Sequence, residues 1–174
     1  GKKQQAKEVN RRKKNKLRDN PNIYSGELKA KLQSAINEIV RLIDKGCRCI
    51  DCDRMNANPC WDGGHRQSRG SHANIRYHLD NIFKQTRYCN SKSEGDKQAY
   101  NDGIKKMYGL DYYNYVDGLG LKYPKLQMPN SELPSKLDEA NKIIKELKSL
   151  DLIYPPETRI KLREKYNKRI GIYK

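Results

Sequence analysis

Apolar residues recur at helical spacing near the start of the chain. Ser25 suits the N-cap of a helix, and Lys45–Gly46 suits its C-terminal end. Between them runs one apolar face, formed by Leu28, Leu32, Ala35, Ile36, Ile39, Val40 and Ile43. We therefore predict a helix of about 20 residues, whose apolar stripe belongs to the core and which serves as a scaffold.

The same spacing returns near the end of the chain. Ser135 can cap a helix, with Asp138 at the third position. Its apolar face consists of Leu137, Ala140, Ile143, Ile144, Leu147 and Leu150. Pro155–Pro156 ends this segment, and Thr158 to about Arg169 predicts a last, basic helix. We expect the two to form a helical hairpin, either docked on the core or paired with a second copy.

From Cys47 onward the pattern changes to short strands and loops. The predicted elements are strands near residues 59–65 and 81–86, followed by helices from Cys89–Asn90 toward Tyr100 and over 101–108. The aromatic segment 111–116 is expected to pack the helices together, with base stacking as the alternative. These elements predict an α+β fold with a small core, because only 35% of the residues are hydrophobic.

The charge of the chain indicates a polyanionic partner. Lys and Arg number 37 against 21 Asp and Glu, a net charge of +16. Nucleic acid is the first expectation, and a merely soluble basic protein is the alternative. Residues 1–20 hold nine of the basic residues and almost no apolar ones, so we expect an arm that contacts phosphates. Its densest cluster is Arg11, Arg12, Lys13 and Lys14.

The cysteines and histidines gather in one stretch. Cys49-Ile-Asp-Cys52 is a CxxC pair of the kind that binds zinc. Five cysteines without a signal peptide favour metal binding over a disulfide framework. No apolar run approaches the roughly 18 residues that a membrane span needs. The chain begins at Gly1 rather than Met, so we expect that an upstream segment has been trimmed.

Three ordered motifs resemble a known nuclease family. They are the CxxC pair, then Trp61-Asp-Gly-Gly-His65, then Asn81-Ile-Phe-Lys-Gln-Thr-Arg-Tyr-Cys89-Asn90. With Arg76, Tyr77, Gly95, Tyr100 and the turn at Tyr108-Gly109-Leu110, they resemble the NinG (Rap) recombination nucleases of lambdoid phages over residues 26–120. The order is similar to HNH (ββα-metal) endonucleases in general and, more distantly, to endonuclease VII-type junction resolvases.

The resemblance assigns roles to particular residues. His65 would be the general base, because an imidazole titrates near neutral pH. Asn81 would fix the imidazole through a hydrogen bond, and Asn90 would ligate a catalytic Mg²⁺ or Mn²⁺. Asp62 is the nearest carboxylate that could join, but it lies three residues before His65 and needs a β-bulge to reach the same side. Arg66, Arg69, Arg76 and Lys84 are the predicted phosphate contacts, and His72 and His78 are expected at the surface or as further phosphate contacts, not as metal ligands.

The zinc ligands depart from the family pattern. NinG-type sequences carry a second CxxC, but here that pair is Thr86-Arg-Tyr-Cys89. If the two strands form an antiparallel hairpin in which His65 pairs with Asn81, Cys60 lies opposite Thr86. Cys60 could then replace the missing zinc ligand. We therefore predict a structural Zn²⁺ on Cys49, Cys52, Cys89 and Cys60, with Cys47 as the alternative to Cys60. The remaining alternative is that the cysteines are buried thiols and no zinc binds.

The implied protein is a metal-dependent, structure-specific DNA endonuclease. Its domains are expected to be a basic arm (1–24), a zinc-stapled HNH core (25–120), a linker (121–134) and a C-terminal helical extension (135–174). Branched DNA such as Holliday junctions or D-loops is the implied substrate, and a homodimer would offer two equivalent sites. The alternatives are a less selective nickase and a non-catalytic DNA-binding or annealing protein. A recombinase or single-strand annealing protein is the further partner left open, and a phage protein of this kind is expected in the host cytoplasm.

Overall fold

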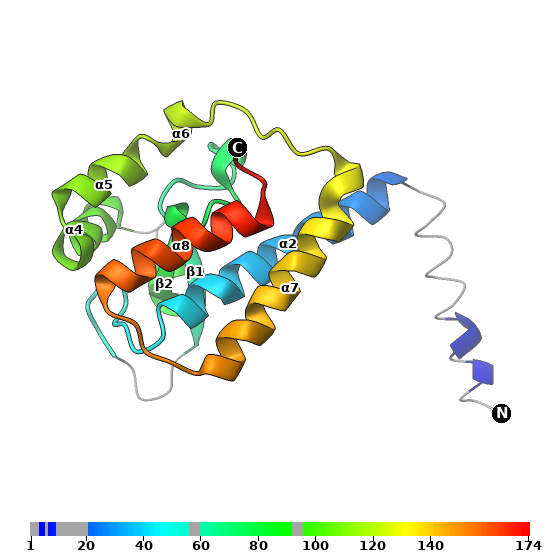
Figure 1. The fold of residues 1–174 in the computed structure, drawn as a ribbon, viewed down its shortest axis with the longest axis horizontal. Coiled ribbons are helices and arrows are strands. Elements are labelled where there is room, and N and C mark those ends of the chain that lie inside the picture. The colour runs from blue at the N-terminus through cyan, green and yellow to red at the C-terminus, as the bar shows by residue number, and fades with distance from the viewer. Residues whose placement is uncertain (1–3, 6, 10–20, 56–59, 92–95) are drawn as a thin grey trace.

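The computed structural model describes residues 4, 5, 7–9, 21–55, 60–91 and 96–174 (Figure 1). The predicted basic arm, residues 1–24, lies largely outside this part of the chain. The elements from residue 21 onward are α2 (Pro21–Ile43), β1 (Trp61–His65), η1 (Ala73–Ile75), η2 (Leu79–Asn81), β2 (Ile82–Thr86), α3 (Arg87–Ser91), α4 (Lys97–Tyr108), α5 (Leu110–Asp117), α6 (Leu119–Lys122), η3 (Asn130–Glu132), α7 (Leu133–Leu150) and α8 (Pro156–Ile170). Helices and one small sheet confirm the α+β class.

Helix α2 begins earlier than the sequence pattern indicated. It starts at Pro21, a residue that suits the first turn of a helix because its missing N–H would have no helical partner there. Ser25 is consequently a buried residue inside the helix and not its cap. The C-terminal end agrees with the prediction, since Gly46 has a φ of +80° that favours glycine.

Strands β1 and β2 form an antiparallel hairpin whose register differs from the prediction by one residue. His65 pairs with Ile82 and not with Asn81, and Trp61 pairs with Thr86. Because neighbouring residues on a strand point to opposite faces, a shift of one position changes which side chain meets Thr86. Cys60 therefore lies beyond the ladder, where its carbonyl accepts the N–H of Arg87.

The C-terminal hairpin is part of the main hydrophobic core. Helix α7 lies alongside α2, and α8 packs against η2 and against both of these helices (Figure 1). The apolar face of α7, which could also have been a dimer interface, is buried here at Ala140, Ile143 and Leu147. Docking on the core is thus the alternative that the structure favours, although Leu150 at the end of the stripe is exposed.

A buried ion pair fastens α8 to the rest of the molecule. Arg163 is fully buried and donates to both carboxylate oxygens of Asp44, at 2.8 and 2.7 Å. Its other terminal nitrogen donates to the carbonyls of Leu79 and Ile82. Asp44 also accepts the backbone N–H of Lys84. Removing one partner of such a pair leaves a buried charge uncompensated and costs about 3–5 kcal/mol.

A second hydrophobic cluster joins α4, α5 and α6 to the hairpin. Phe83 of β2 packs edge-on against Tyr100 and Tyr112, with ring centroids 6.1 and 6.4 Å apart. Segment 111–116 therefore does pack the helices together, within a helix, α5, that the sequence pattern did not predict. Tyr100 also donates to the carbonyl of Gly64 at 2.7 Å, which fixes α4 beside the end of β1. None of the helices in the described ranges is both long and apolar enough to cross a membrane.

Candidate active site

A cleft of about 510 Å³ opens beside β1. Its lining residues come from α2, β1, the following loop, α3 and α4, and are Asn37, Arg41, Asp62, Gly63, His65, Ser68, Arg69, Asn90 and Lys97. The cleft brings together His65, Asp62 and Asn90, three residues predicted for the site. His65 and Asn90 also border a small adjoining cavity of about 40 Å³. Asn81, the remaining predicted catalytic residue, lies behind the cleft and is buried.

The hydrogen bonding of His65 determines which ring nitrogen can accept a proton. Its Nε2 lies 2.8 Å from the carbonyl oxygen of Arg76. A carbonyl can only accept, so Nε2 carries the proton and Nδ1 of the neutral ring keeps its lone pair. The adjacent Gln33 accepts from Arg76 Nε at 3.2 Å and donates to Asn37 at 3.0 Å, which holds the surrounding side chains in place.

The surroundings of His65 keep its ring neutral. Burial lowers the pKa of His65 to about 4, and the charges of Arg69 and Arg76 act in the same direction, while the hydrogen bond to the Arg76 carbonyl opposes them. At neutral pH the imidazole is consequently available as a base and not as an acid.

Asn81 acts on His65 indirectly. Its Oδ1 accepts the N–H of Gln67 at 2.9 Å, and its Nδ2 donates to the carbonyls of Gln67 and Ile75 at 3.1 and 3.5 Å. The predicted hydrogen bond from this side chain to the imidazole is replaced by the one that the imidazole donates to the Arg76 carbonyl. Asn81 instead holds both ends of the loop that presents that carbonyl.

Asp62 and Asn90 meet across the cleft. Asn90 Nδ2 donates to Asp62 Oδ2 at 3.1 Å, and Arg87 lies 3.5 Å from the other carboxylate oxygen. The bulge that we expected Asp62 to need is absent, because the ladder pairs every residue from Trp61 to His65, and Asp62 lines the cleft with His65 without it. Carboxylate and amide oxygens are hard ligands of the kind that Mg²⁺ and Mn²⁺ take, so the pair fits the predicted catalytic metal.

The two glycines between Asp62 and His65 are required by close packing. A Cβ on Gly63 would lie 2.9 Å from the Cβ of Asn37, and one on Gly64 would lie 1.7 Å from Gln85 Oε1. Real Cβ atoms do not approach so closely, so a side chain at Gly63 would push α2 away from β1, and one at Gly64 would displace the Gln85 side chain. The glycines thereby allow α2 to form one wall of the cleft.

Arg69 and Arg76 are positioned to contact an anion. Arg69 is exposed at the cleft, and together with Arg76 it also lines a groove of about 480 Å³. The other wall of that groove is α2, through Gly26, Lys29, Ala30, Gln33, Ser34 and Asn37. Because Asn37 and Arg69 line both spaces, the groove leads directly into the cleft.

Arg66 and Lys84 are used within the fold, contrary to their prediction as phosphate contacts. The Arg66 side chain is only 11% exposed and pairs with Asp117, while its Nε donates to Asn101 at 3.0 Å. Lys84 is 7% exposed, donates to the carbonyl of Cys47 at 2.9 Å, and lies 4.0 Å above the ring of Trp61. The predicted contacts Arg11, Arg12, Lys13 and Lys14 lie outside the described residues.

A cluster of three cysteines lies next to the cleft. The sulfur atoms of Cys49, Cys52 and Cys89 all lie within 4.8 Å of one another, close to the roughly 3.8 Å that sulfurs around tetrahedral zinc require. Burial opposes ionisation of Cys49, but the N–H groups of Cys52 and Thr86 outweigh it and lower the pKa of the thiol. A thiolate is the form that binds a metal, so the cluster fits an ion such as Zn²⁺.

The fourth predicted ligand is not in the cluster. Cys60 is exposed, as expected from the shifted register, and Cys47 is buried elsewhere. Thr86 lies at this point, with its N–H 3.3 Å from the sulfur of Cys49 and its hydroxyl accepting the N–H of Cys89 at 3.2 Å. Of the described residues, three therefore offer ligands to one metal ion.

The family model of the Bacteriophage Lambda NinG protein matches residues 1–150 of the chain. The chain belongs to the NinG family. Comparisons with the curated proteins and with the solved structures gave no match. The NinG match contains all of the cleft and the cysteine cluster, whereas α8 and its buried Arg163 lie after the matched residues.

Some lining residues of this NinG cleft were missed from the sequence. Asn37 and Arg41 of α2 and Lys97 of α4 line it, although α2 had been interpreted as scaffold only. A signal was present, since Gly26, Ala30, Gln33, Asn37 and Arg41 repeat at helical spacing beside the apolar stripe. A helix with a second stripe of small and polar residues has a face that is not part of the hydrophobic core. Such a face can line a groove or a cleft.

Proposed function

We propose that this chain is a metal-dependent endonuclease that hydrolyses phosphodiester bonds in DNA. The observation that supports it is the neutral imidazole of His65, whose Nδ1 has no hydrogen-bond partner among the described residues, in one cleft with the oxygens of Asp62 and Asn90. A base beside two hard oxygen ligands is what metal-assisted hydrolysis of a phosphodiester requires.

Each residue of the cleft has a distinct task in this reaction. His65 Nδ1 removes a proton from a water molecule as the water oxygen bonds to phosphorus and the bond to the leaving oxygen breaks. The Arg76 carbonyl keeps the ring oriented and stabilises the imidazolium that forms. Asp62 and Asn90 would hold Mg²⁺ or Mn²⁺, which supplies Lewis-acid stabilisation of the phosphate charge when bound.

The basic groove on α2 supports DNA as the substrate. Lys29, Arg69 and Arg76 surround the groove, and Arg41 and Lys97 add two cations at the cleft. The small residues on that face of α2 let a phosphate backbone approach the helix closely. Cations in this arrangement neutralise phosphates without reading sequence, which suits recognition by DNA shape.

The finer proposal is that the DNA is branched. Holliday junctions or D-loops are what the resemblance to recombination nucleases implies, and a less selective nickase would have the same cleft. In the competing proposal, the cysteine cluster and the basic surface serve only DNA binding or annealing. Gly64, which occupies the position where many relatives of the wider family carry an aspartate, favours this non-catalytic alternative.

Cleavage of a panel of DNA structures tests the proposal. Linear, forked and four-way DNA would be incubated with Mg²⁺, Mn²⁺ or EDTA, and nicks would be mapped under single-turnover conditions. We expect metal-dependent cutting that is faster on the four-way DNA. Asn90→Ala should slow cutting about 10- to 100-fold, and raised metal concentration should restore the rate. The control Asn141→Ala, at an exposed position of α7, should have no effect. Tight DNA binding with no cutting in any metal would favour the non-catalytic alternative.

A further inference from the structure

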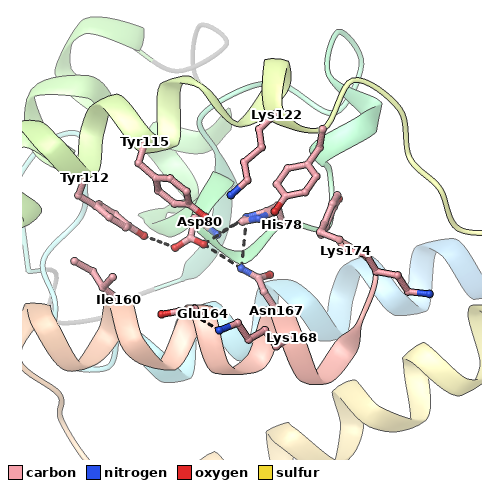
Figure 2. A pocket seen from close by; sticks show the side chains of 12 residues that line it. His78, Asp80, Tyr112, Tyr115, Lys122, Ile160, Glu164, Asn167, Lys168 and Lys174 are labelled. Carbon is pink, nitrogen blue, oxygen red and sulfur yellow. Dashed lines mark hydrogen bonds and ion pairs between the residues drawn. The ribbon is translucent and has the colours of Figure 1, made fainter.

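A second cavity lies on the far side of the segment that connects β1 to β2. Its volume is about 580 Å³, and it shares no lining residue with the His65 cleft. Figure 2 shows Tyr112, Tyr115 and Lys122 projecting from one side and Asn167 of α8 from the other, with Asp80 and His78 between them. A volume of this size is within the range of roughly 300–1,000 Å³ typical of small-molecule sites.

Aromatic rings form much of the wall. The ring of His78 lies 5.3 Å from that of Tyr123 and 4.8 Å from that of Tyr173, and the two tyrosines are 5.1 Å apart. Tyr115 adds a ring from α5 that is 40% exposed. Flat aromatic walls of this kind bind a planar ligand by stacking, and they accept any nucleobase because every base has a π-face.

The base of the cavity is polar and held rigidly. Asp80 accepts from the Tyr112 hydroxyl and from Asn167 Nδ2, the latter at 3.0 Å. The Asp80 N–H donates to His78 Nδ1 at 3.3 Å, so in the neutral ring the proton is on Nε2. Burial, with a further contribution from Lys122, lowers the pKa of His78 to about 3, which keeps the ring neutral. His78 thus offers a fixed hydrogen-bond donor that the proposed hydrolysis does not use.

Lys122 provides a positive charge at the aromatic wall. Its amine lies 5.5 Å from the ring of Tyr115 and 5.4 Å from that of Tyr123. Within the described ranges no carboxylate lies at ion-pair distance from it, whereas the nearby Lys168 is paired with Glu164 at 2.7 Å. An amine beside aromatic rings suits a ligand that combines an anion with a flat ring.

We propose that this cavity binds a single nucleotide, with the base against the tyrosine rings and the phosphate at Lys122 Nζ. The nucleotide can come from two sources, a free nucleotide or an unpaired residue of a DNA strand. The second source rests on the proposed function, because unpaired residues occur where branched DNA strands separate. In this proposal the aromatic cavity contacts a nucleobase, whereas the groove on α2 contacts the phosphate backbone of the DNA.

Calorimetric titration of the full chain tests this without metal or cleavage. The probes are deoxyadenosine 5′-monophosphate, deoxyadenosine and inorganic phosphate. We expect the monophosphate to bind about tenfold more tightly than either fragment, and Tyr115→Leu and Lys122→Gln each to weaken it about tenfold. Tyr113→Leu, on the same helix, and Lys161→Gln, exposed on α8 outside the cavity, are the matched controls and should bind normally.

A second titration separates the two sources. A DNA hairpin with one bulged nucleotide is compared with the fully paired hairpin, for the parent chain and Tyr115→Leu. Weakening confined to the bulged hairpin supports an unpaired residue, and weakening of the monophosphate alone supports a free nucleotide. Phosphate binding as tightly as the monophosphate, or normal binding by both cavity variants, would overturn the proposal. His65→Ala should retain monophosphate binding, so failure of the nuclease proposal is distinguishable.

Discussion

Two cavities border the segment between β1 and β2, and each contains a histidine of the same Nε2–H tautomer that uses a different ring nitrogen within the fold. In the cleft, His65 donates from Nε2 to a carbonyl and keeps a lone pair on Nδ1. In the aromatic cavity, His78 accepts at Nδ1 from a backbone N–H and keeps a proton on Nε2. Burial lowers the pKa of both. The neutral ring of His65 can therefore accept a proton at Nδ1. The neutral ring of His78 can only donate a hydrogen bond from Nε2, because its Nδ1 is already engaged.

The two cavities also differ in the types of residue that line them. The cleft is formed by cations, amides, a carboxylate and glycine, with no tyrosine among its residues. The other cavity takes four tyrosines, two from α5, one that follows α6 and one near the C-terminal end of the chain. In the two proposals, phosphodiester hydrolysis and base contacts would be separated by this one segment, which hydrogen bonds from Asn81 and Asn74 hold in place.

The largest expected effect compares the two histidines. His65→Ala should lower the single-turnover cleavage rate by about 10²- to 10⁴-fold, because water must then lose its proton without a base. DNA binding should remain near normal, since many cations share it. His78→Gln keeps a donor and should cut within a few-fold of the parent. Equal losses in both variants would mean that the nitrogen left unengaged does not separate the roles, and normal cutting by His65→Ala would remove the nuclease assignment.

The cysteine cluster should affect only one of the cavities. Cys52→Ser should lose the bound zinc and lower the midpoint of thermal unfolding, because three sulfurs no longer surround the ion. Cleavage should fall too, since Cys89 and Asn90 are neighbours on α3. Cys60→Ser is the matched control and should keep its zinc, as its sulfur lies outside the cluster. Elemental analysis and thermal melts measure both, and zinc loss in Cys60→Ser would restore that residue as a ligand.

The two histidines should also make stability depend on pH. With pKa values of about 4 for His65 and about 3 for His78, the folded chain stays unprotonated where the unfolded chain, with an ordinary value near 6.5, takes up protons. The free energy of unfolding should therefore fall as pH decreases below about 6.5. We expect about 1 kcal/mol from each residue by pH 5.5.

Denaturant unfolding at several pH values measures this dependence. His65→Gln and His78→Gln should each flatten it in that pH range. A slope that persists in both variants would show that other groups are responsible. Cleavage by the parent should persist below pH 6 if His65 remains neutral there.

The smallest expected effect separates two neighbouring arginines. Arg69→Gln should weaken DNA binding a few-fold and reduce the salt slope by about 1, because one phosphate contact is lost. Arg66→Gln should instead lower stability, since Asp117 and Asn101 lose their partner. Binding titrations at several salt concentrations alongside thermal melts distinguish them. A larger salt effect from Arg66 than from Arg69 would contradict the assignment.

The sequence predicted those features that depend on local spacing. The apolar stripes of α2 and α7, the two strands and the CxxC turn follow from periodicity and residue type, and so does the meeting of His65 with Asn90 once the family pattern is recognised. The register did not follow, because Cys60 and Trp61 are adjacent and the pattern allowed either residue to face Thr86.

Which charged side chains pair across long sequence separations was the feature least predictable from the sequence. Arg66 and Lys84 carry the same charge as Arg69, but their partners are Asp117 and the carbonyl of Cys47, which only the folded chain brings near. Likewise, His78 is 2% exposed, contrary to the surface position predicted for it, because tyrosines from α6 and the C-terminal segment cover it. Residue type states what a side chain can bind, and the tertiary fold decides whether that capacity remains free.

The pairing of Asp44 with Arg163 also makes completion of the core depend on α8. The partners are 119 residues apart, and Arg163 is supplied by α8 after the cleft residues have all been made. Until then Asp44 would be a carboxylate without its counterion where α2 meets β2. Under the proposed function, a nascent chain would carry His65 and Asn90 before this pairing could form. Cutting would then begin only once α8 has been made, and shorter products would not damage the DNA around them.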